Sequence, residues 1–422
     1  MNILVIGSGG REHAICHAFA KSDRLVKLYC AEGNAGIAEL AELVNIKPDQ
    51  IDELANFALV NRIDLTFVGG EVPLALGIVD EFESRGLKII GASQAAARLE
   101  SSKAFAKDFM LRHSIPTAEY RTAQSTSEAI AILESGIFGE ENSPVVVKAD
   151  GLAAGKGVVV ATDRKEAIEA IRSMSELAGE AAAKQIVLEE RIFGKEISLL
   201  MFCDGENFEL MPATRDHKRI GDGDTGPNTG GMGTITDDRL LTSEQTETII
   251  ETIIKPTLAG CVAEEFPFRG ILFLGLMMTG SGPSLLEYNV RFGDPETQAI
   301  LVRLETDLVD ICESMIDGSL GKHLIRWRKG SSACVVLASE NYPAKPRTGD
   351  VIDGLENAVV TDLHIFHAGT ALNRGGEFVT SGGRVLGVTA VADDLETALA
   401  WAYKGVSKIS WPGMQYRRDI GK

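Results

Sequence analysis

Residues 284–298 read Ser-Leu-Leu-Glu-Tyr-Asn-Val-Arg-Phe-Gly-Asp-Pro-Glu-Thr-Gln, a run in which polar side chains interrupt an apolar strand. The apolar residues of this strand are Leu285, Leu286 and Val290. Side chains alternate between the two faces of a strand, so Glu287, Asn289 and Arg291 are predicted to point the same way. A carboxylate and an amide oxygen suit Mg²⁺, and a guanidinium beside them can bind a phosphate. The stretch therefore predicts a metal and phosphate site, and the alternative is a strand end with a surface salt bridge.

A helix is predicted to begin directly after this strand. Asp294 suits the N-cap position, because its short acidic side chain accepts hydrogen bonds from free backbone N–H groups. Proline is common at the first helical position, so we expect the helix to begin at Pro295.

The composition is that of an ordinary globular protein. With 422 residues, 45% hydrophobic and 24% charged, the chain is long enough for about three domains of roughly 150 residues. It has no apolar run near the ~20 residues that span a bilayer, and its N-terminus does not read as a signal peptide. The six cysteines are scattered without Cys-x-x-Cys spacing, which indicates reduced thiols and a cytoplasmic protein. The formal net charge of −18 disfavours general nucleic-acid binding, because it repels phosphate backbones.

The first hundred residues alternate short apolar strands with amphipathic helices, which predicts a parallel doubly wound sheet and an α/β fold. Strands are expected at 2–6, 25–30, 65–68 and 88–90, and helices at 11–21, 51–61 and near 75–85. Ligands of such sheets bind at the carboxyl ends of the strands. Those ends are the loops at 7–12, 32–36 and 69–71.

A smaller unit and a glycine-rich segment follow a helix predicted at 93–113, which carries Lys103 and Lys107. The smaller unit is expected to have strands at 118–121, 144–148, 157–161 and 185–190, and helices at 126–135 and 163–177. Further strands are predicted at 196–203, 207–211 and 270–278, with a helix at 243–264. A final β-rich segment has strands near 332–339, 361–366 and 384–391 and a helix at 393–408.

The loop Gly7-Ser8-Gly9-Gly10-Arg11 joins the first strand to the first helix. Its glycines let the backbone approach an anion, and the helix start offers free N–H groups. One interpretation is a nicotinamide dinucleotide site with Glu32 as ribose ligand, although the Gly-x-Gly-x-x-Gly pattern needs glycine where Glu12 stands. Arg11 favours instead a site for one terminal phosphate, and a simple tight turn is the structural alternative.

A second loop, residues 148–157, lies between two predicted strands and consists mainly of glycine and alanine with lysines near both ends. It does not match the Walker A pattern, because Lys156 precedes Gly157 rather than serine or threonine. Such a loop can still fold over a polyphosphate. Lys148 follows an apolar strand and is predicted to be half-buried, so it needs an anionic partner, either a phosphate or a carboxylate in a structural ion pair.

A third segment, residues 216–233, contains a basic cluster followed by many glycines, which cannot pack a core. Its polar residues Lys218, Arg219, Asn228 and Thr229 could line an anion and a small zwitterion together. His217 could act as a general base, but a lone histidine beside basic residues is more often a hydrogen-bonding bystander.

Taken together, these motifs resemble those of the ATP-grasp ligases and, within them, the phosphoribosylamine–glycine ligases. The long glycine segment and NVRFGDPETQ are the most specific. The similar segments run in order over nearly the whole chain: VIGSGGREHA at 5–14, GNAG at 33–36, SKAFAKDF at 102–109, IPTAEY at 115–120, VVKADGLAAGKGV at 146–158, DHKRIGDGDTGPNTGGMG at 216–233, EYNVRFGDPETQ at 287–298, RTGD at 347–350, FHAGT at 366–370 and GGRVL at 382–386.

The resemblance implies four parts and one reaction. The parts are an N-terminal substrate domain (1–102), an ATP-grasp body (103–120 and 194–325), a lid subdomain (121–193) and a C-terminal domain (326–422). In the reaction ATP phosphorylates the carboxylate of glycine, and the amine of 5-phosphoribosylamine then attacks the acyl phosphate. The products are glycinamide ribonucleotide, ADP and phosphate, in de novo purine biosynthesis. The resemblance implies Mg²⁺ or Mn²⁺ as cofactor, ATP as co-substrate and only small-molecule partners, with a monomer as the working expectation.

The resemblance also implies roles for individual residues. Glu287 and Asn289 match the metal ligands. The ATP site comprises Lys103, Lys148, Gly151, Gly155, Lys156, Gly157, the adenine hinge Glu189, Glu190 and Ile192, and the ribose ligand Glu196. The phosphoribosylamine site comprises Gly9, Gly10, Arg11, Glu12, Asn34 and Glu71. Glycine and the transferring phosphoryl group would meet Asp216, Lys218, Asn228, Thr229, Arg291 and Gly293, and the catalytic cations are Arg291, Lys148 and Lys218.

Five positions depart from the pattern of the family, namely Ser8, Glu32, Gly70, Ala92 and Arg215. All flank the phosphoribosylamine side or segment 216–233, so they leave the ATP half untouched. Three alternatives stay open: another ATP-grasp carboxylase or transformylase, a dinucleotide-dependent oxidoreductase, and a nucleotide-binding protein without catalysis. The match of segment 216–233 argues against the first alternative. The second leaves two features unexplained: the strand of the predicted metal site at residues 284–291, which we call the metal strand, and the lysines of the loops at 148–157 and 216–233.

Overall fold

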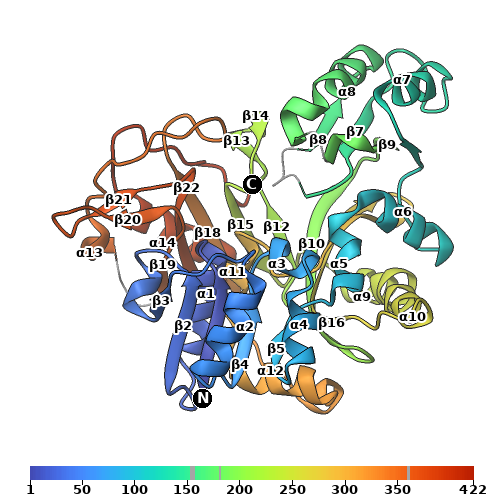
Figure 1. Cartoon of the computed structure of the whole chain (residues 1–422). Coiled ribbons are helices and arrows are strands. Elements are labelled where there is room, and N and C mark those ends of the chain that lie inside the picture. The colour runs from blue at the N-terminus through green and yellow to red at the C-terminus, as the bar shows by residue number, and fades with distance from the viewer. Residues whose placement is uncertain (153–156, 180–181, 359–361) are drawn as a thin grey trace.

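The structure is a computed structural model that describes residues 1–152, 157–179, 182–358 and 362–422. In Figure 1 the N-terminal region is blue, a separate small unit at the upper right is green, and the C-terminal region is red. Within the described ranges no helix has the length and apolar character needed to cross a membrane.

The N-terminal region is a five-stranded parallel sheet of order β3-β2-β1-β4-β5, as predicted. Leu4 and Ile6 of β1 lie in one core, which also takes in residues of α2 and α4, while Ile3 and Val5 lie in the other, with residues of α1 and α12. Helices therefore cover both faces. The elements are β1 (Asn2–Gly7), α1 (Gly10–Phe19), β2 (Lys27–Glu32), η1 (Ile37–Glu39), β3 (Glu42–Val44), α2 (Ile51–Val60), β4 (Leu65–Val68), α3 (Glu71–Ala75), α4 (Ile78–Ser84), β5 (Ile89–Ile90) and α12 (Leu308–Asp317).

The small unit, which we call the lid, is a four-stranded antiparallel sheet of order β6-β9-β7-β8. Two helices pack their apolar residues against this sheet in a core of their own. The predicted strands and helices of this unit are all present. They are β6 (Tyr120–Ala123), α7 (Thr126–Glu134), β7 (Val145–Ala149), β8 (Val158–Ala161), α8 (Arg164–Ala178), η2 (Ala182–Lys184) and β9 (Ile186–Glu190).

A nine-stranded sheet runs through the centre of the molecule in the order β17-β16-β10-β12-β15-β18-β22-β19, with β11 beside β10. Because β15 pairs with β18, the central sheet continues into the C-terminal strands. The division expected at residue 325 thus falls within one sheet, and all four boundaries stay predictions. The strands are β10 (Lys195–Asp204), β11 (Phe208–Leu210), β12 (Thr214–Asp216), β15 (Gly233–Asp237), β16 (Arg269–Thr279), β17 (Gly282–Asn289), β18 (Ser331–Ala338), β19 (Leu363–His367) and β22 (Arg384–Ala392).

Smaller elements complete the fold around this sheet. They are β13 (Arg219–Gly221), β14 (Thr225–Asn228), α9 (Ser243–Ile249), η3 (Ile250–Ile254), α10 (Lys255–Ala263), α11 (Glu296–Leu301), η4 (Leu320–Lys322), α13 (Leu355–Ala358), β20 (Thr370–Leu372), β21 (Phe378–Thr380) and α14 (Leu395–Val406). Segment 216–233, expected as a glycine loop, thus contains the β13–β14 hairpin.

Two local predictions were wrong. The single helix expected at 93–113 is two helices, α5 (Gln94–Ser101) and α6 (Lys103–Arg112), because Ser102 is extended and its Oγ caps α6 by accepting from Phe105 N. The second is the helix start after β17: α11 begins at Glu296 with Pro295 as its N-cap residue. The carboxylate of Asp294 instead accepts from Gln298 Nε2 at 2.8 Å and pairs with Arg384 at 3.2 Å.

Candidate active site

Strand β17 and the residues directly after it carry the three polar side chains that were predicted to share one face. Tyr288 and Val290 are buried, whereas Glu287, Asn289 and Arg291 are only partly buried. Arg291 lies just past the end of the strand, and its Nη2 donates to Asn289 Oδ1 at 3.2 Å. The register shifts beside Leu276, so Leu286 has no partner on β16 and is half-buried rather than part of the core.

The Glu287 carboxylate receives no hydrogen bond or ion pair from the described residues, and among these residues its oxygens are open to a ligand. Burial acts to raise its pKa, but Lys218, Lys148 and Lys103 outweigh burial and hold the pKa below the usual range. An ionised carboxylate next to an amide oxygen fits a hard divalent cation. The described residues contain no group of three or more metal-ligating His, Cys, Asp or Glu, so water or phosphate oxygens would complete the shell, as is usual for Mg²⁺.

Lys148 is buried in β7 and has the anionic partner that the sequence required. Its Nζ lies 2.7 Å from Glu189 Oε1 and donates to the Leu286 carbonyl at 3.3 Å. Lys107 Nζ lies 2.8 Å from the other oxygen of Glu189. Burial acts to raise the pKa of Glu189, but the two lysines lower it below its usual range. Glu189, expected at the adenine hinge, is thus the shared partner of two buried lysines.

The start of the second loop is attached to the N-terminus of α6. Asp150 accepts from Ser102 Oγ at 3.1 Å and from Ala104 N at 3.0 Å, so a lid residue caps a helix of the body. Lys103 Nζ donates to the Gly151 carbonyl at 3.1 Å, and burial lowers its pKa. Gly151 has φ +138°, a conformation that favours glycine. The Gly157 carbonyl accepts from Ala149 N at 2.8 Å, whereas Gly155 and Lys156 lie outside the described residues.

The expected hinge residues Glu190 and Ile192 lie where β9 leads into β10, with Glu190 exposed and Ile192 half-buried. Just beyond them, Glu196 Oε2 lies 3.2 Å from Lys218 Nζ. This ion pair joins the hinge region to segment 216–233, so the expected ribose ligand and an expected catalytic cation are neighbours.

Lys218 is the cation of segment 216–233 that faces the metal strand. The Lys218 side chain is 47% exposed. Desolvation within the site acts to lower its pKa, but Glu196, Glu287 and Asp216 raise the pKa above the ordinary value, so Lys218 is charged. Burial together with Glu296 raises the pKa of Asp216.

The other polar residues of this segment have structural partners. Thr229 Oγ1 donates to the Lys218 carbonyl and accepts from Gly231 N, and Asn228 pairs with Arg219 in the hairpin. His217 Nε2 accepts from Gly421 N, and burial lowers its pKa to about 4, which favours a bystander role.

Arg291 connects the metal strand to the N-terminal region through two carboxylates. It pairs with Glu100 at 2.8 Å and with Glu71 at 3.3 Å. Glu71 also lies 4.0 Å from Arg11, whose Nη1 donates to the Phe292 carbonyl. Gly293 follows that carbonyl, and a Cβ there would clash with Glu296 Oε2. The two halves of the expected site are therefore contiguous.

A cleft of about 370 Å³ lies between the first loop and two C-terminal segments. Its cation is Arg384, which donates to the carbonyls of Gly230 and Asp294 and pairs with the Asp294 carboxylate. Gly9 precedes α1, so free N–H groups of that helix start lie at the cleft. The cleft is lined by Ser8, Gly9, Gly33, Asn34, Asp294, Ala368, Gly369, Thr370, Ser381 and Arg384.

Glu12 and Asn34 are occupied in holding the walls of this cleft. Buried Glu12 accepts from Gly9 N and from Arg11 Nε, both at 2.6 Å. Asn34 Nδ2 donates to the carbonyls of Ser8 and His367 at 2.8 Å, and its Oδ1 accepts from the backbone N–H groups of residues 36 and 37. Gly10 begins α1 where a Cβ would lie 2.6 Å from Gln298 Nε2. These residues shape the cleft, and of the expected set Gly9 and Asn34 line it.

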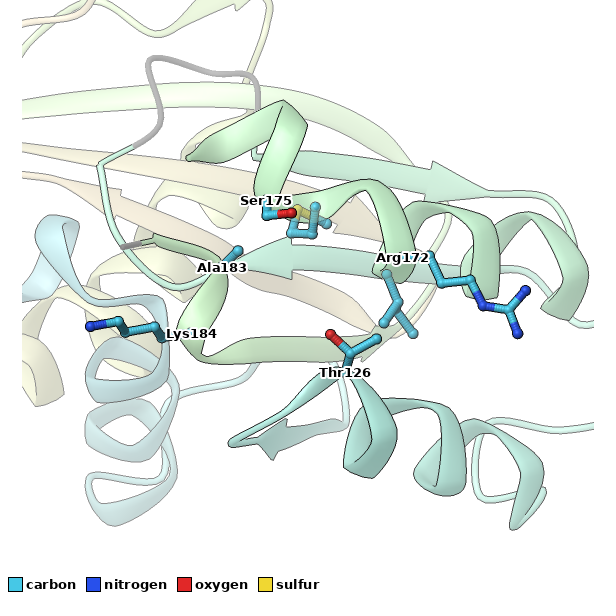
Figure 2. Close-up of a pocket in the computed structure, with 7 residues that line it drawn as sticks. Thr126, Arg172, Ser175, Ala183 and Lys184 are labelled. Carbon is cyan, nitrogen blue, oxygen red and sulfur yellow. The ribbon is translucent and has the colours of Figure 1, made fainter. Parts of the chain in front are cut away.

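A second hollow of about 190 Å³ lies on the lid between α7, α8 and η2 (Figure 2). Of the predicted site residues that the structure describes, none lines it. Its cations Arg172 and Lys184 are exposed and point away from each other in Figure 2. The described residues of this hollow therefore offer no convergent charge for a ligand.

Sequence reasoning assigned no role to Glu100, to Lys107 or to the C-terminal residues of the cleft. Glu100 and Lys107 are charged residues on the buried faces of α5 and α6, and such placement is itself a signal of a charged partner. The segments that contain Thr370 and Arg384 were noted among the similar motifs, but their residues were not placed in the site. Of the five departures, Ser8 lines the cleft, and Gly70 adjoins Arg11.

The lid, the buried lysines and the polar face of β17 define an ATP-grasp enzyme. Family models for phosphoribosylglycinamide synthetase match almost the whole chain: the N domain over residues 1–100, the ATP-grasp (A) domain over 101–297 and the C domain over 332–422. The chain therefore belongs to the phosphoribosylglycinamide synthetase family.

Curated relatives and a solved structure agree with this assignment. The chain is 47% identical over 427 residues to the phosphoribosylamine–glycine ligase of Xanthomonas axonopodis pv. citri, covering 100% of this chain and 97% of the relative. It is 45% identical to that of Caldanaerobacter subterraneus subsp. tengcongensis, covering 100% and 99%. The crystal structure of phosphoribosylamine–glycine ligase from Thermotoga maritima superposes with a TM-score of 0.86 at 33% identity over the whole of both chains. The chain is an ATP-dependent ligase of this type.

Proposed function

We propose that the chain joins glycine to 5-phosphoribosylamine through a glycyl phosphate, using two adjoining half-sites. The observation that carries this proposal is the chain of contacts from the metal strand through Arg291, Glu71 and Arg11 to the loop that borders the cleft. It supports a route by which an amine held in the cleft meets an acyl phosphate formed at β17.

The nucleotide half-site would bind ATP between the lid and the body. Glu287 and Asn289 would hold Mg²⁺ or Mn²⁺, which supplies charge neutralisation on the phosphates when bound. Lys103 and Lys148 would bind phosphate oxygens, and Lys218 and Arg291 would face the group in transfer. Two oxyanions ~4 Å apart repel by about 4 kcal/mol at an effective dielectric of 20, so positioned cations supply most of the catalysis that phosphoryl transfer needs.

The phosphoribosylamine half-site would be the cleft beside α1. The helix start and Arg384 together offer N–H donors and a cation for the 5-phosphate. The amine is nucleophilic when neutral, so no dedicated general base is needed. The lid would exclude water, which would otherwise hydrolyse the acyl phosphate.

The test is ADP release from ATP, Mg²⁺ and glycine, with and without phosphoribosylamine formed in place from ribose 5-phosphate and ammonia. We expect release to require both substrates and to be lost in Glu287→Ala. Glu251→Ala, at an exposed position on η3, is the matched control and should behave as wild type. ADP release without phosphoribosylamine, or Mg²⁺-dependent activity near normal in Glu287→Ala, would overturn the assignment.

We also propose that the enzyme acts as a cytoplasmic monomer. The six cysteines are all free and buried, which supports a reducing compartment. Light scattering across a range of protein concentrations tests the monomer, and a concentration-dependent rise in mass would contradict it.

A further inference from the structure

Lys107 is a buried cation for which the reaction described above has no role. Its side chain and that of Glu189 are each 2% exposed, and Lys148 pairs with the other oxygen of the same carboxylate. Two lysines around one glutamate leave an excess positive charge in the interior. Burying such charge is costly unless an anion compensates it.

The cluster of Lys107, Lys148 and Glu189 joins the lid to the metal strand. Lys107 extends from α6 of the body, whereas the other two residues belong to lid strands β7 and β9. Lys107 also donates to Thr117 Oγ1 at 2.7 Å, and Thr117 donates to the Leu285 carbonyl at 2.6 Å. Since Lys148 donates to the next carbonyl of β17, both lysines are connected to the backbone directly before Glu287, Lys107 through Thr117.

We propose that Lys107 is a positioning residue that compensates Glu189 and so allows Lys148 to exchange this carboxylate for a nucleotide phosphate. The inference rests on the proposed role of Lys148 in binding ATP. With Lys148 as its only partner, Glu189 would be left as an uncompensated buried charge whenever Lys148 turned to a phosphate. Lys107 removes that penalty, because it pairs with the second oxygen of Glu189 and is fixed to Thr117.

The charges that face Lys107 are consistent with this role. They are Glu189 on β9, Lys148 on β7 and Glu287 on β17. Burial lowers the pKa of Lys107 to about 8, with Glu189 acting in the opposite direction. Lys107 is therefore charged at neutral pH.

The experiment is a double-mutant cycle read by calorimetric titration with ADP and Mg²⁺, which does not depend on ligase turnover. Lys107→Met should weaken ADP binding at least tenfold, and Lys107→Arg should restore most of the affinity. In the Glu189→Gln background, Lys107→Met should change the affinity by less than threefold, because no buried carboxylate then needs the lysine. Lys255→Met, at an exposed position on α10, is the control for loss of a surface lysine.

The outcomes separate the possible roles. An equal loss of affinity from Lys107→Met in both backgrounds would overturn the inference, because Lys107 would not act through Glu189. Unchanged ADP affinity with a lowered melting temperature would also overturn it, since Lys107 would then be purely structural. If Lys107→Met alone does not fold, the ADP affinity of the double variant is compared with that of Glu189→Gln, because both members of the buried pair are then removed. A difference of less than threefold supports the inference, and a larger loss overturns it. Failure of the wild-type protein to bind ADP would instead overturn the proposed function.

Discussion

Asn34→Asp is expected to damage the phosphoribosylamine half-site specifically. The substitution keeps the shape of the side chain and the two acceptor bonds from the backbone of residues 36 and 37. It removes both donors, so a carboxylate faces the carbonyls of Ser8 and His367, which now lie 2.8 Å from the side-chain nitrogen. These carbonyls come from opposite walls of the cleft, one from the N-terminal loop and one from β19.

The magnitude follows from these two contacts. A carbonyl left without a donor costs about 1–3 kcal/mol, with the lower end for one that can reach water. Ser8 borders the cleft and His367 is buried, so we expect a loss of about 2–4 kcal/mol in the free energy of unfolding. Separation of the two walls should also raise KM for phosphoribosylamine about tenfold or more, because about 1.4 kcal/mol of lost binding energy corresponds to a factor of ten. KM for ATP should change less than twofold.

The assays are urea denaturation and steady-state kinetics with each substrate varied in turn. Asn373→Asp is the matched control, because Asn373 makes a similar set of bonds in the exposed β20–β21 turn: Nδ2 donates to Glu377, and Oδ1 accepts from two backbone N–H groups. The control should leave both KM values unchanged. An unchanged KM for phosphoribosylamine in Asn34→Asp, despite the expected loss of stability, would refute the assignment of the cleft.

Three further outcomes are expected. Glu287→Gln should lower kcat about 100-fold or more in steady-state assays, because it removes a charged metal ligand. ADP affinity measured without metal should change less than threefold, and an equal loss in kcat and in this affinity would contradict the metal role. Arg384→Gln should raise KM for phosphoribosylamine at least about tenfold, as expected for loss of a charge-assisted bond, and an effect on KM for ATP alone would contradict this. Burial lowers the pKa of His13 to about 3 and of His367 to about 4, so below the ordinary value of about 6.5 the unfolded chain takes up protons that the folded chain does not. The free energy of unfolding should therefore be independent of these two histidines above pH 6.5 and should fall by up to about 2 kcal/mol for each of them by pH 5. Urea denaturation across this pH range measures the fall, and a flat profile would refute it.

The local sequence pattern was sufficient to predict those features of the fold and the site that depend on a single helix or strand. The period-two alternation in residues 284–291 placed Glu287 and Asn289 on one face, and the strand–helix alternation gave the parallel N-terminal sheet. The need of a buried lysine for an anion predicted a partner for Lys148. Each of these inferences depends on neighbours along the chain, and the sequence displays those directly.

Contacts between distant segments could not be read in the same way. The helix expected at 93–113 breaks at Ser102, and Asp150, 48 residues further along, supplies additional capping bonds to α6. The partner of Lys148 is Glu189 on a strand of the lid, and Arg291 pairs with Glu100, 191 residues away. Asp294 misled the prediction of the helix start, because Arg384 and Gln298 bind its carboxylate and it therefore does not cap α11.

Five cations of the site share one property that explains how an acidic protein with a net charge of −18 can bind anionic substrates. Each of the five has a carboxylate partner within the protein: Lys148 with Glu189, Lys218 with Glu196, Arg291 with Glu71 and Glu100, Arg11 with Glu12 and Arg384 with Asp294. Lys103 instead donates to the Gly151 carbonyl. Such pairs fix the cations in place and lower the cost of burying them. A substrate phosphate must then compete with the carboxylate for the cation. The affinity for the phosphate therefore depends on whether a second cation still compensates the charge of that carboxylate. Glu71 has both Arg11 and Arg291, and Glu189 has both Lys107 and Lys148. Carboxylates with two cationic partners are therefore the positions at which a substrate phosphate can take one cation without leaving a buried charge alone.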